Sequence, residues 1–113
     1  MPRIDLWIAP YNLNLILGAT PLHMCGMGQD NQRSTEYIIK RGGNIEAIDT
    51  YSYRPLHRMA SNNLAIGARA LLEAGADLLA MTSRGETAKD IAIESGAMDA
   101  LNVLEEFEHK RSQ

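Results

Sequence analysis

Hydrophobic and polar positions recur along this chain at a nearly fixed spacing. The segment IIKRGGNIEA at 38–47 aligns with LLEAGADLLA at 71–80, so Ile38 corresponds to Leu71. The segment GETAKDIA at 85–92 keeps the same offset, because its Thr87 corresponds to Arg54. The tetrapeptide TPLH at 20–23 returns as RPLH at 54–57, with one extra residue in the first unit. Because self-similarity at a period of about 20–50 residues is typical of repeat architectures, the pattern predicts three stacked units.

Each unit contains the signals for two helices. Thr20 is an N-cap residue type, and Pro21 follows it at the first helical position, where its missing N–H costs nothing. A second helix is predicted where Ile38 in the first unit matches Leu71 in the second. Gly42 and Gly75 come just after that helix, where a left-handed C-cap is expected. The pattern therefore predicts an all-α chain of helix pairs.

The same signals set the expected boundaries. Residues 1–17 precede the first unit as an apolar N-terminal extension or capping segment. The units are expected at about 18–51, 52–84 and 85–107, with helices at 87–95 and 98–107 in the third. Residues 108–113 form a charged tail.

The chain resembles the ankyrin repeat family in the segments GATPLH (18–23), LLEAGADLLA (71–80) and GETAKDIA (85–92). The resemblance covers roughly residues 12–107, or about three repeats. It implies an ankyrin-repeat solenoid of stacked helix-turn-helix units joined by β-turn fingers. A single unit cannot bury its own apolar face, and stacking does so.

Composition narrows the classes of partner. The net charge of −3 argues against an electrostatic nucleic-acid interface. The longest apolar-rich stretch, residues 4–17, is too short and too polar to span a bilayer. The single cysteine cannot form an internal disulfide. We therefore expect an intracellular protein, of undetermined compartment, with protein partners, no nucleic acid and no direct membrane span.

Candidate catalytic chemistry is weak. His23 and His57 fall in separate units, the third unit has Asp90 at that position, and no cluster with metal-ligand spacing accompanies them. The resemblance gives these histidines a structural role, a hydrogen bond to the neighbouring turn. Cys25 sits at a small-residue position that matches Met59 and predicts a buried thiol. We assign no catalytic, cofactor-binding or metal-binding residue and expect no enzyme.

Several residues depart from the family pattern. Arg54 replaces the capping Thr, and Ser52, at a usual Gly position, is a candidate substitute cap. The Asp that braces each finger is present as Asp49 and replaced by Thr82. Gly26 and Gly28 are expected inside the first helix of the first unit. Each interior Gly costs about 1 kcal/mol against Ala, so that helix is expected to be weak.

Members of the family are mostly binding modules that use their finger tips and first helices. Carried over to this sequence, the predicted protein-binding residues are Ile16, Leu17, Met27, Ile48, Tyr51, Tyr53, Asn62, Met81 and Arg84. Tyrosine and apolar side chains gathered on one exposed face mark interfaces. Tyr51 and Tyr53 are expected at the centre of this surface, where aromatic residues contribute most to binding.

Two functions fit these observations. The first is a non-catalytic protein–protein interaction module that binds its partner through the concave finger and helix face. The alternative is a constitutive accessory subunit of a larger, multi-subunit assembly, membrane-associated assemblies included, docked through the apolar N-terminal segment and the exposed Ile16 and Leu17.

Overall fold

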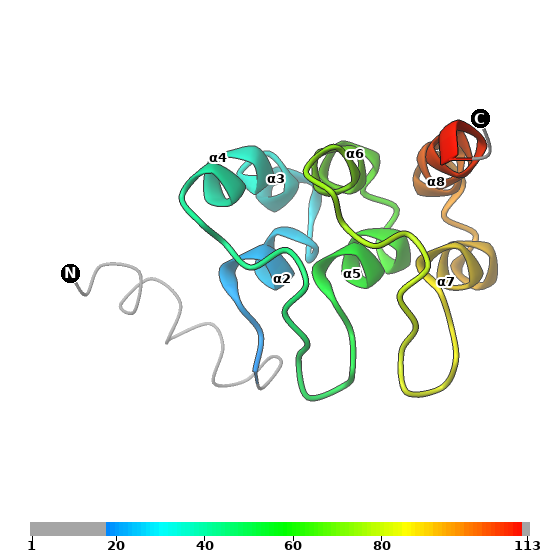
Figure 1. The fold of residues 1–113 in the computed structure, drawn as a ribbon, viewed down its shortest axis with the longest axis horizontal. Helices are drawn as coiled ribbons and strands as arrows, with labels where there is room; N and C mark the ends of the chain where they lie inside the picture. Colours follow the sequence, from blue (N-terminus) through cyan, green and yellow to red (C-terminus); the bar gives the residue numbers. More distant parts are fainter. Residues whose placement is uncertain (1–17, 112–113) are drawn as a thin grey trace.

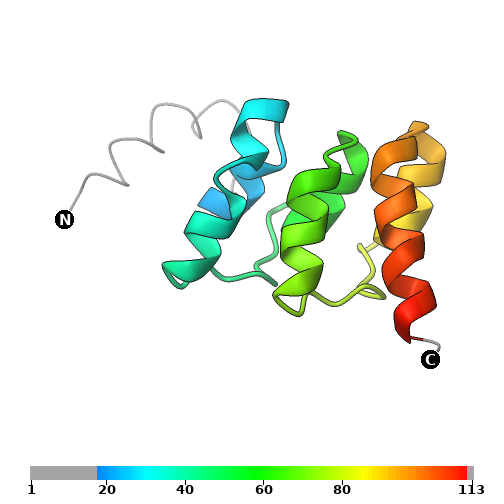
Figure 2. The same ribbon diagram turned by 90° about the horizontal axis from the view of Figure 1, so that it is seen from above.

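Helices of unequal length pack in two layers in the computed structural model, which describes residues 18–111. The helices are α2 (Pro21–Cys25), α3 (Gln29–Gln32), α4 (Thr35–Lys40), α5 (Pro55–Ser61), α6 (Ala65–Glu73), α7 (Ala88–Ser95) and α8 (Met98–Arg111). One layer holds α2, α5 and α7, and the other holds α3 with α4, α6 and α8 (Figure 1). Figure 2 shows the pairs side by side in a row. Residues 18–111 contain no strand, so the predicted all-α repeat architecture is confirmed.

Local sequence explains where the inner-layer helices begin. The Thr20 hydroxyl accepts from the backbone N–H of His23, and Thr87 makes the same bond to Asp90 before α7. Arg54 precedes α5, and its guanidinium makes no cap bond. The backbone of Arg54 does make a cap bond, because its N–H donates to His57 Nδ1 at 2.9 Å.

Glycines end the helices where the sequence predicts them. Gly42 follows α4 with φ +92°, and Gly75 follows α6 with φ +101°. Gly96 caps α7 in the left-handed conformation, with φ +69°. Residues with a Cβ rarely adopt this conformation, so glycine is the natural residue at each stop. Helix α8 then continues to Arg111, beyond the expected end at residue 107.

The first unit differs from the expectation for its first helix. Gly26 and Gly28 were expected inside one helix, and this is wrong because α2 ends at Cys25 and Gly28 caps the separate helix α3. A Cβ at Gly26 would lie 2.5 Å from the Arg58 Cβ of α5. The missing side chain therefore allows α2 and α5 to approach closely, and Gly26 has a packing role.

The core runs through the whole stack between the two layers. Its largest fully buried apolar side chains are those of Leu22, Met59, Leu64, Leu71 and Leu104. Side-chain amides of one repeat reach the outer-layer helix of the next. Gln32 Oε1 accepts from the backbone N–H of Gly67 at 3.0 Å, and Asn63 Oδ1 accepts from Ala100 at 3.0 Å. These bonds satisfy donors in the first turns of α6 and α8.

Candidate protein-binding surface

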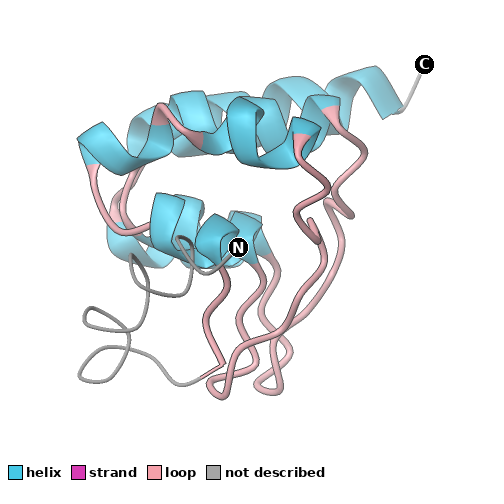
Figure 3. Cartoon of the chain, turned by 90° about the vertical axis from the view of Figure 1, so that its left-hand side faces the viewer, coloured by secondary structure: helices cyan, strands magenta, loops and turns pink. Residues whose placement is uncertain are grey.

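Two long loops project from the same side of the helix layers (Figure 3). We call them finger 1 (residues 41–54, between α4 and α5) and finger 2 (residues 74–87, between α6 and α7). In Figure 1 they extend side by side below α5 and α7. Each finger carries side chains that the sequence analysis predicted to bind a partner.

Finger 1 is held by the buried carboxylate of Asp49. Its Oδ1 accepts from the backbone N–H groups of Tyr51 at 2.8 Å and Tyr53 at 3.1 Å. Its Oδ2 accepts from the Arg58 guanidinium at 3.0 Å. Both carboxylate oxygens are therefore bonded to the turn or to α5, and these bonds fix the position of the turn.

Thr82 has the corresponding role in finger 2. Its hydroxyl accepts from the backbone N–H groups of Arg84 at 3.2 Å and Glu86 at 3.4 Å. Thr82 aligns with Asp49 at the same repeat offset that relates Leu71 to Ile38. A neutral hydroxyl thus replaces the carboxylate and keeps the same pair of turn contacts.

Ser52 links the two fingers. Its hydroxyl donates to Ser83 Oγ at 3.0 Å and accepts from the Ser83 backbone N–H at 2.9 Å. The expectation that Ser52 caps the following helix is therefore wrong. Ser52 has φ +64°, close to the +78° of Gly85 at the equivalent position of finger 2. A non-glycine residue keeps this conformation, and its hydroxyl joins the tips.

The two buried histidines connect each inner helix to the next finger. His23 Nε2 lies 2.7 Å from the carbonyl oxygen of Tyr53, and His57 Nε2 lies 3.0 Å from that of Ala80. In each ring Nδ1 accepts a backbone N–H, so the neutral imidazole carries its proton on Nε2. Burial lowers the pKa of both imidazoles. The predicted structural role is confirmed.

Apolar side chains lie exposed on these fixed fingers. Ile48 is 55% exposed and Tyr51 62% on finger 1, and Leu79 is 51% exposed and Met81 61% on finger 2. We call Ile48, Tyr51 and Met81 the finger surface. Ile48 and Met81 occupy equivalent positions of successive repeats, so the surface recurs from one finger to the next.

Leu79 was missing from the sequence prediction. Along finger 2, Leu78, Ala80 and Thr82 are buried, whereas Leu79 and Met81 are exposed. Leu78 and Leu79 form a turn, and Leu79 lines a small hollow with Lys89, Leu104 and Glu108 of α7 and α8. Leu79 therefore lies at the edge that α7 and α8 form.

Some predicted residues are less accessible than expected. Tyr53 is half-buried against the core, its ring 5.6 Å from the His57 ring and 4.2 Å below the Arg58 guanidinium. Met27 is also half-buried. The expectation that these two side chains are exposed is wrong, and for Tyr53 the reason is its packing on the His57 and Arg58 side chains.

The remaining predicted residues fall into three groups. Asn62 is exposed, but its amide donates to the Gly26 carbonyl oxygen at 2.6 Å and so joins α5 to the turn after α2. Arg84 is exposed at the tip of finger 2. Ile16 and Leu17 lie outside the described residues. A binding role for all nine residues stays a prediction.

The single cysteine is buried in α2. Burial raises the pKa of the Cys25 thiol, which disfavours the nucleophilic thiolate. Within residues 18–111, no three His, Cys, Asp or Glu side chains lie together as metal ligands would.

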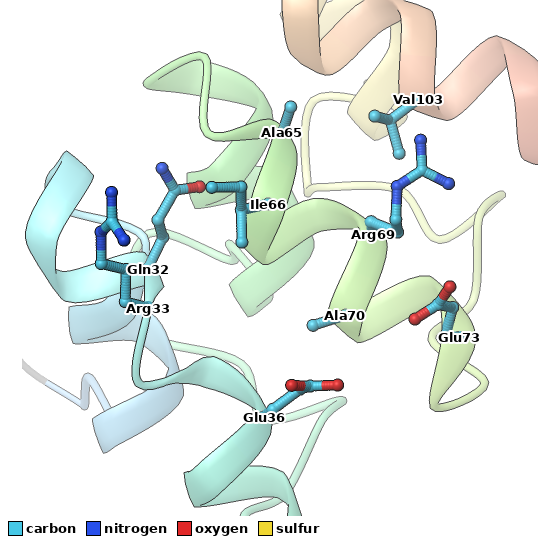
Figure 4. Close-up of a pocket in the computed structure, with 9 residues that line it drawn as sticks. All are labelled: Gln32, Arg33, Glu36, Ala65, Ile66, Arg69, Ala70, Glu73 and Val103. Carbon is cyan, nitrogen blue, oxygen red and sulfur yellow. The ribbon is translucent and has the colours of Figure 1, made fainter.

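A hollow of about 280 Å³ lies on the outer layer between α3, α4 and α6 (Figure 4). Arg33 and Arg69 face Glu36 and Glu73 around it, so its charges are mixed. Arg69 already donates two bonds to Glu106, at 2.8 and 2.9 Å, and this contact lowers the pKa of Glu106 to about 2. The hollow therefore favours neither a cationic nor an anionic ligand.

A comparison with known protein families identifies part of the chain. A family model described as ankyrin repeats (many copies) matches residues 38–92, which span α4 to α7 and both fingers. No curated protein matches the chain. Among the described helices, none combines the length and the apolar character needed to cross a membrane.

Proposed function

Because residues 38–92 are ankyrin repeats, which are generally protein–protein interaction modules, we propose that this chain is a non-catalytic module whose finger surface binds a protein. The observation that carries the proposal is the exposure of Ile48, Tyr51 and Met81 on two fingers fixed by internal hydrogen bonds. Isolated exposed apolar residues are common, whereas a repeated set on adjacent loops marks an interaction site.

The rigidity of the fingers supports binding without a large ordering cost. Asp49 and Thr82 hold the two turns, and the Ser52–Ser83 pair joins their tips. A loop that is already fixed loses little conformational entropy when a partner binds. The partner is therefore expected to be a folded protein surface or segment that presents apolar side chains to Ile48 and Met81.

Tyr51 is the proposed anchor of this surface. Its ring is 62% exposed and lies 5.9 Å from the Arg58 guanidinium, which itself is held by Asp49. Exposed tyrosines bring large contact area with few rotatable bonds, and anchors of this kind often contribute about 2 kcal/mol or more. Arg84 lies at the rim, where it favours an acidic side chain on the partner.

The test is affinity capture from the source cell followed by quantitative mass spectrometry. We expect the double variant Ile48→Asp/Met81→Asp to lower recovery of the bound protein by about tenfold or more, because two charges replace apolar contacts. The matched control is Ile66→Asp, an equally exposed isoleucine of α6 in the outer layer, 55% exposed. Equal recovery with the wild-type chain, the double variant and the control would contradict the proposal.

The alternative, a permanent accessory subunit docked through Ile16 and Leu17, involves residues outside the described range. It predicts recovery of the partner in fixed stoichiometry, and it predicts that Ile16→Asp/Leu17→Asp, but not Ile48→Asp/Met81→Asp, abolishes that recovery. The same capture experiment therefore separates the two functions.

A further inference from the structure

One edge of the stack carries an apolar groove. It lies between the start of α2 and the length of α4, has a volume of about 370 Å³, and is lined by Pro21, Ser34, Tyr37, Ile38, Arg41 and the loop at Gly43. Within residues 18–111, α2 and α4 have helix neighbours on one side only, whereas α5 and α6 are packed on both. Figure 2 shows α2–α4 at the edge of the row.

The repeat itself shows that these positions are normally covered. Pro21 and Ile38 are partly exposed, whereas their equivalents in the second repeat, Pro55 and Leu71, are buried. In the third repeat Leu104 is equivalent to Ile38 and is also fully buried. The position is thus buried wherever a preceding repeat packs against it. The groove is the place where such cover is absent among the described residues.

The chain itself supplies apolar residues beside this groove. Residues 4–17 contain Trp7, Leu13 and other large apolar side chains, and they end shortly before Pro21, which lines the groove. An extended chain spans about 3.3–3.6 Å per residue, so Trp7 can reach any point of a groove that begins at Pro21. The Arg41 guanidinium lies 4.9 Å from the Tyr37 ring, which shows that this groove already accommodates a cation–π contact.

We propose that residues 4–13 fold back over the first repeat and insert Trp7 into the groove between Pro21, Tyr37 and Ile38. The segment takes the place of a preceding repeat and covers the edge that the helix pairs leave open. This inference is independent of the finger surface, which lies on the projecting loops.

The experiment uses the fluorescence of the full chain, because Trp7 is its one tryptophan. If Trp7 occupies the groove, its emission lies at a shorter wavelength than in the urea-unfolded chain, and acrylamide quenches it several-fold less. Tyr37→Asp places a charge in the groove at a side chain that is 59% exposed, so the fold is retained. We expect this variant to shift the emission toward that of the unfolded chain.

Two further variants make the result specific. Ser34→Asp puts a charge on the groove rim before α4, where Asp is as acceptable an N-cap as Ser, and it should have the same effect as Tyr37→Asp. Ile93→Asp, 56% exposed on α7 near the other edge, should leave the emission unchanged. Far-UV circular dichroism confirms that each variant is folded.

Three results would overturn the proposal. In the first, Trp7 of the folded wild-type chain is as accessible to acrylamide as in the unfolded chain. In the second, Trp7 is shielded but neither groove variant exposes it, which places the segment elsewhere. In the third, shielding disappears on dilution together with a dimer in sedimentation, which makes a second copy the occupant.

Discussion

The first repeat (α2, α3 and α4) and the third repeat (α7 and α8) follow the same plan but differ in helix length and in how their ends are satisfied. In the first repeat the outer-layer segment is broken into α3 and α4, and neither Gly28 nor Ser34 makes a side-chain cap bond. In the third, α8 is one helix of 14 residues and α7 ends at a left-handed glycine cap, whereas the capping box at the start of α7 is also present in α2.

The difference has a local cause and a tertiary compensation. Gly26 and Gly28 stop α2 after five residues, so few backbone bonds hold it. A contact with the second repeat supports its end, because the Asn62 amide donates to the Gly26 carbonyl oxygen. The first repeat therefore depends on its neighbour, whereas α7 of the third repeat has a glycine cap of its own. Four predictions test this, in order of expected effect.

The largest effect is expected from truncating the core at each end. Leu22→Ala and Leu104→Ala each remove a fully buried side chain and should cost about 2–5 kcal/mol of unfolding free energy. Native-state hydrogen exchange should separate them. Leu22→Ala should reduce protection mainly in α2 and α4, and Leu104→Ala should reduce it throughout. If both variants lost protection equally in all helices, the first and third repeats would not differ in stability.

A smaller effect is expected from filling the close contact at Gly26. Gly26→Ala places a Cβ 2.5 Å from the Arg58 Cβ, so α2 must move away from α5, at a cost of about 1–3 kcal/mol. Gly28→Ala is the matched control, because its added Cβ has no neighbour closer than 4.0 Å. Urea unfolding of both proteins measures the difference. Equal stabilities would show that Gly26 has no packing role.

Acid should destabilise the repeats that contain a buried histidine. Burial lowers the folded-state pKa of His23 and His57, so the unfolded chain binds protons first as the pH falls. The stability that each neutral histidine contributes is fully present above the pKa of the unfolded chain, about 6.5. Below that pH the free energy of unfolding falls, by up to about 1.4 kcal/mol per pH unit for each histidine. Thermal melts between pH 7.5 and 5 should show this.

The control for the acid effect is the double variant His23→Gln/His57→Gln, which cannot titrate at these positions. It should be less stable at pH 7.5 but should lose less stability between pH 6.5 and 5 than the wild-type chain does. A melting temperature that falls equally in both proteins would assign the acid sensitivity to other groups.

The smallest effect is expected from the helix caps. Thr87→Ala removes the side-chain bond to the Asp90 N–H and should cost about 1 kcal/mol. Ser34→Ala should have almost no effect, because Ser34 makes no cap bond before α4. The melting temperatures of the two variants provide the measurement. If Ser34→Ala lowered the melting temperature more than Thr87→Ala, the conclusion that α7 is better capped than α4 would be wrong.

The tyrosines show how far the sequence could predict the binding surface. Tyr51 and Tyr53 are two residues apart on one finger, and the pattern placed both outside. Tyr51 is exposed, but Tyr53 turns toward the core and packs on the His57 ring. We therefore expect Tyr51→Ala to weaken partner binding alone, whereas Tyr53→Ala also lowers the melting temperature. Which side of a finger faces the stack depends on the turn held by Asp49.

The repeat plan follows from the sequence alone, since the residues that start and stop each helix act on their own backbone. Thr20, Thr87, Gly42, Gly75 and Gly96 all have the roles that their residue types and spacing predict. Which of the equivalent positions are covered depends on how the repeats pack against one another. Ile38 is partly exposed and Leu71 is buried although they align, because burial depends on the neighbouring repeat and not on the residue itself.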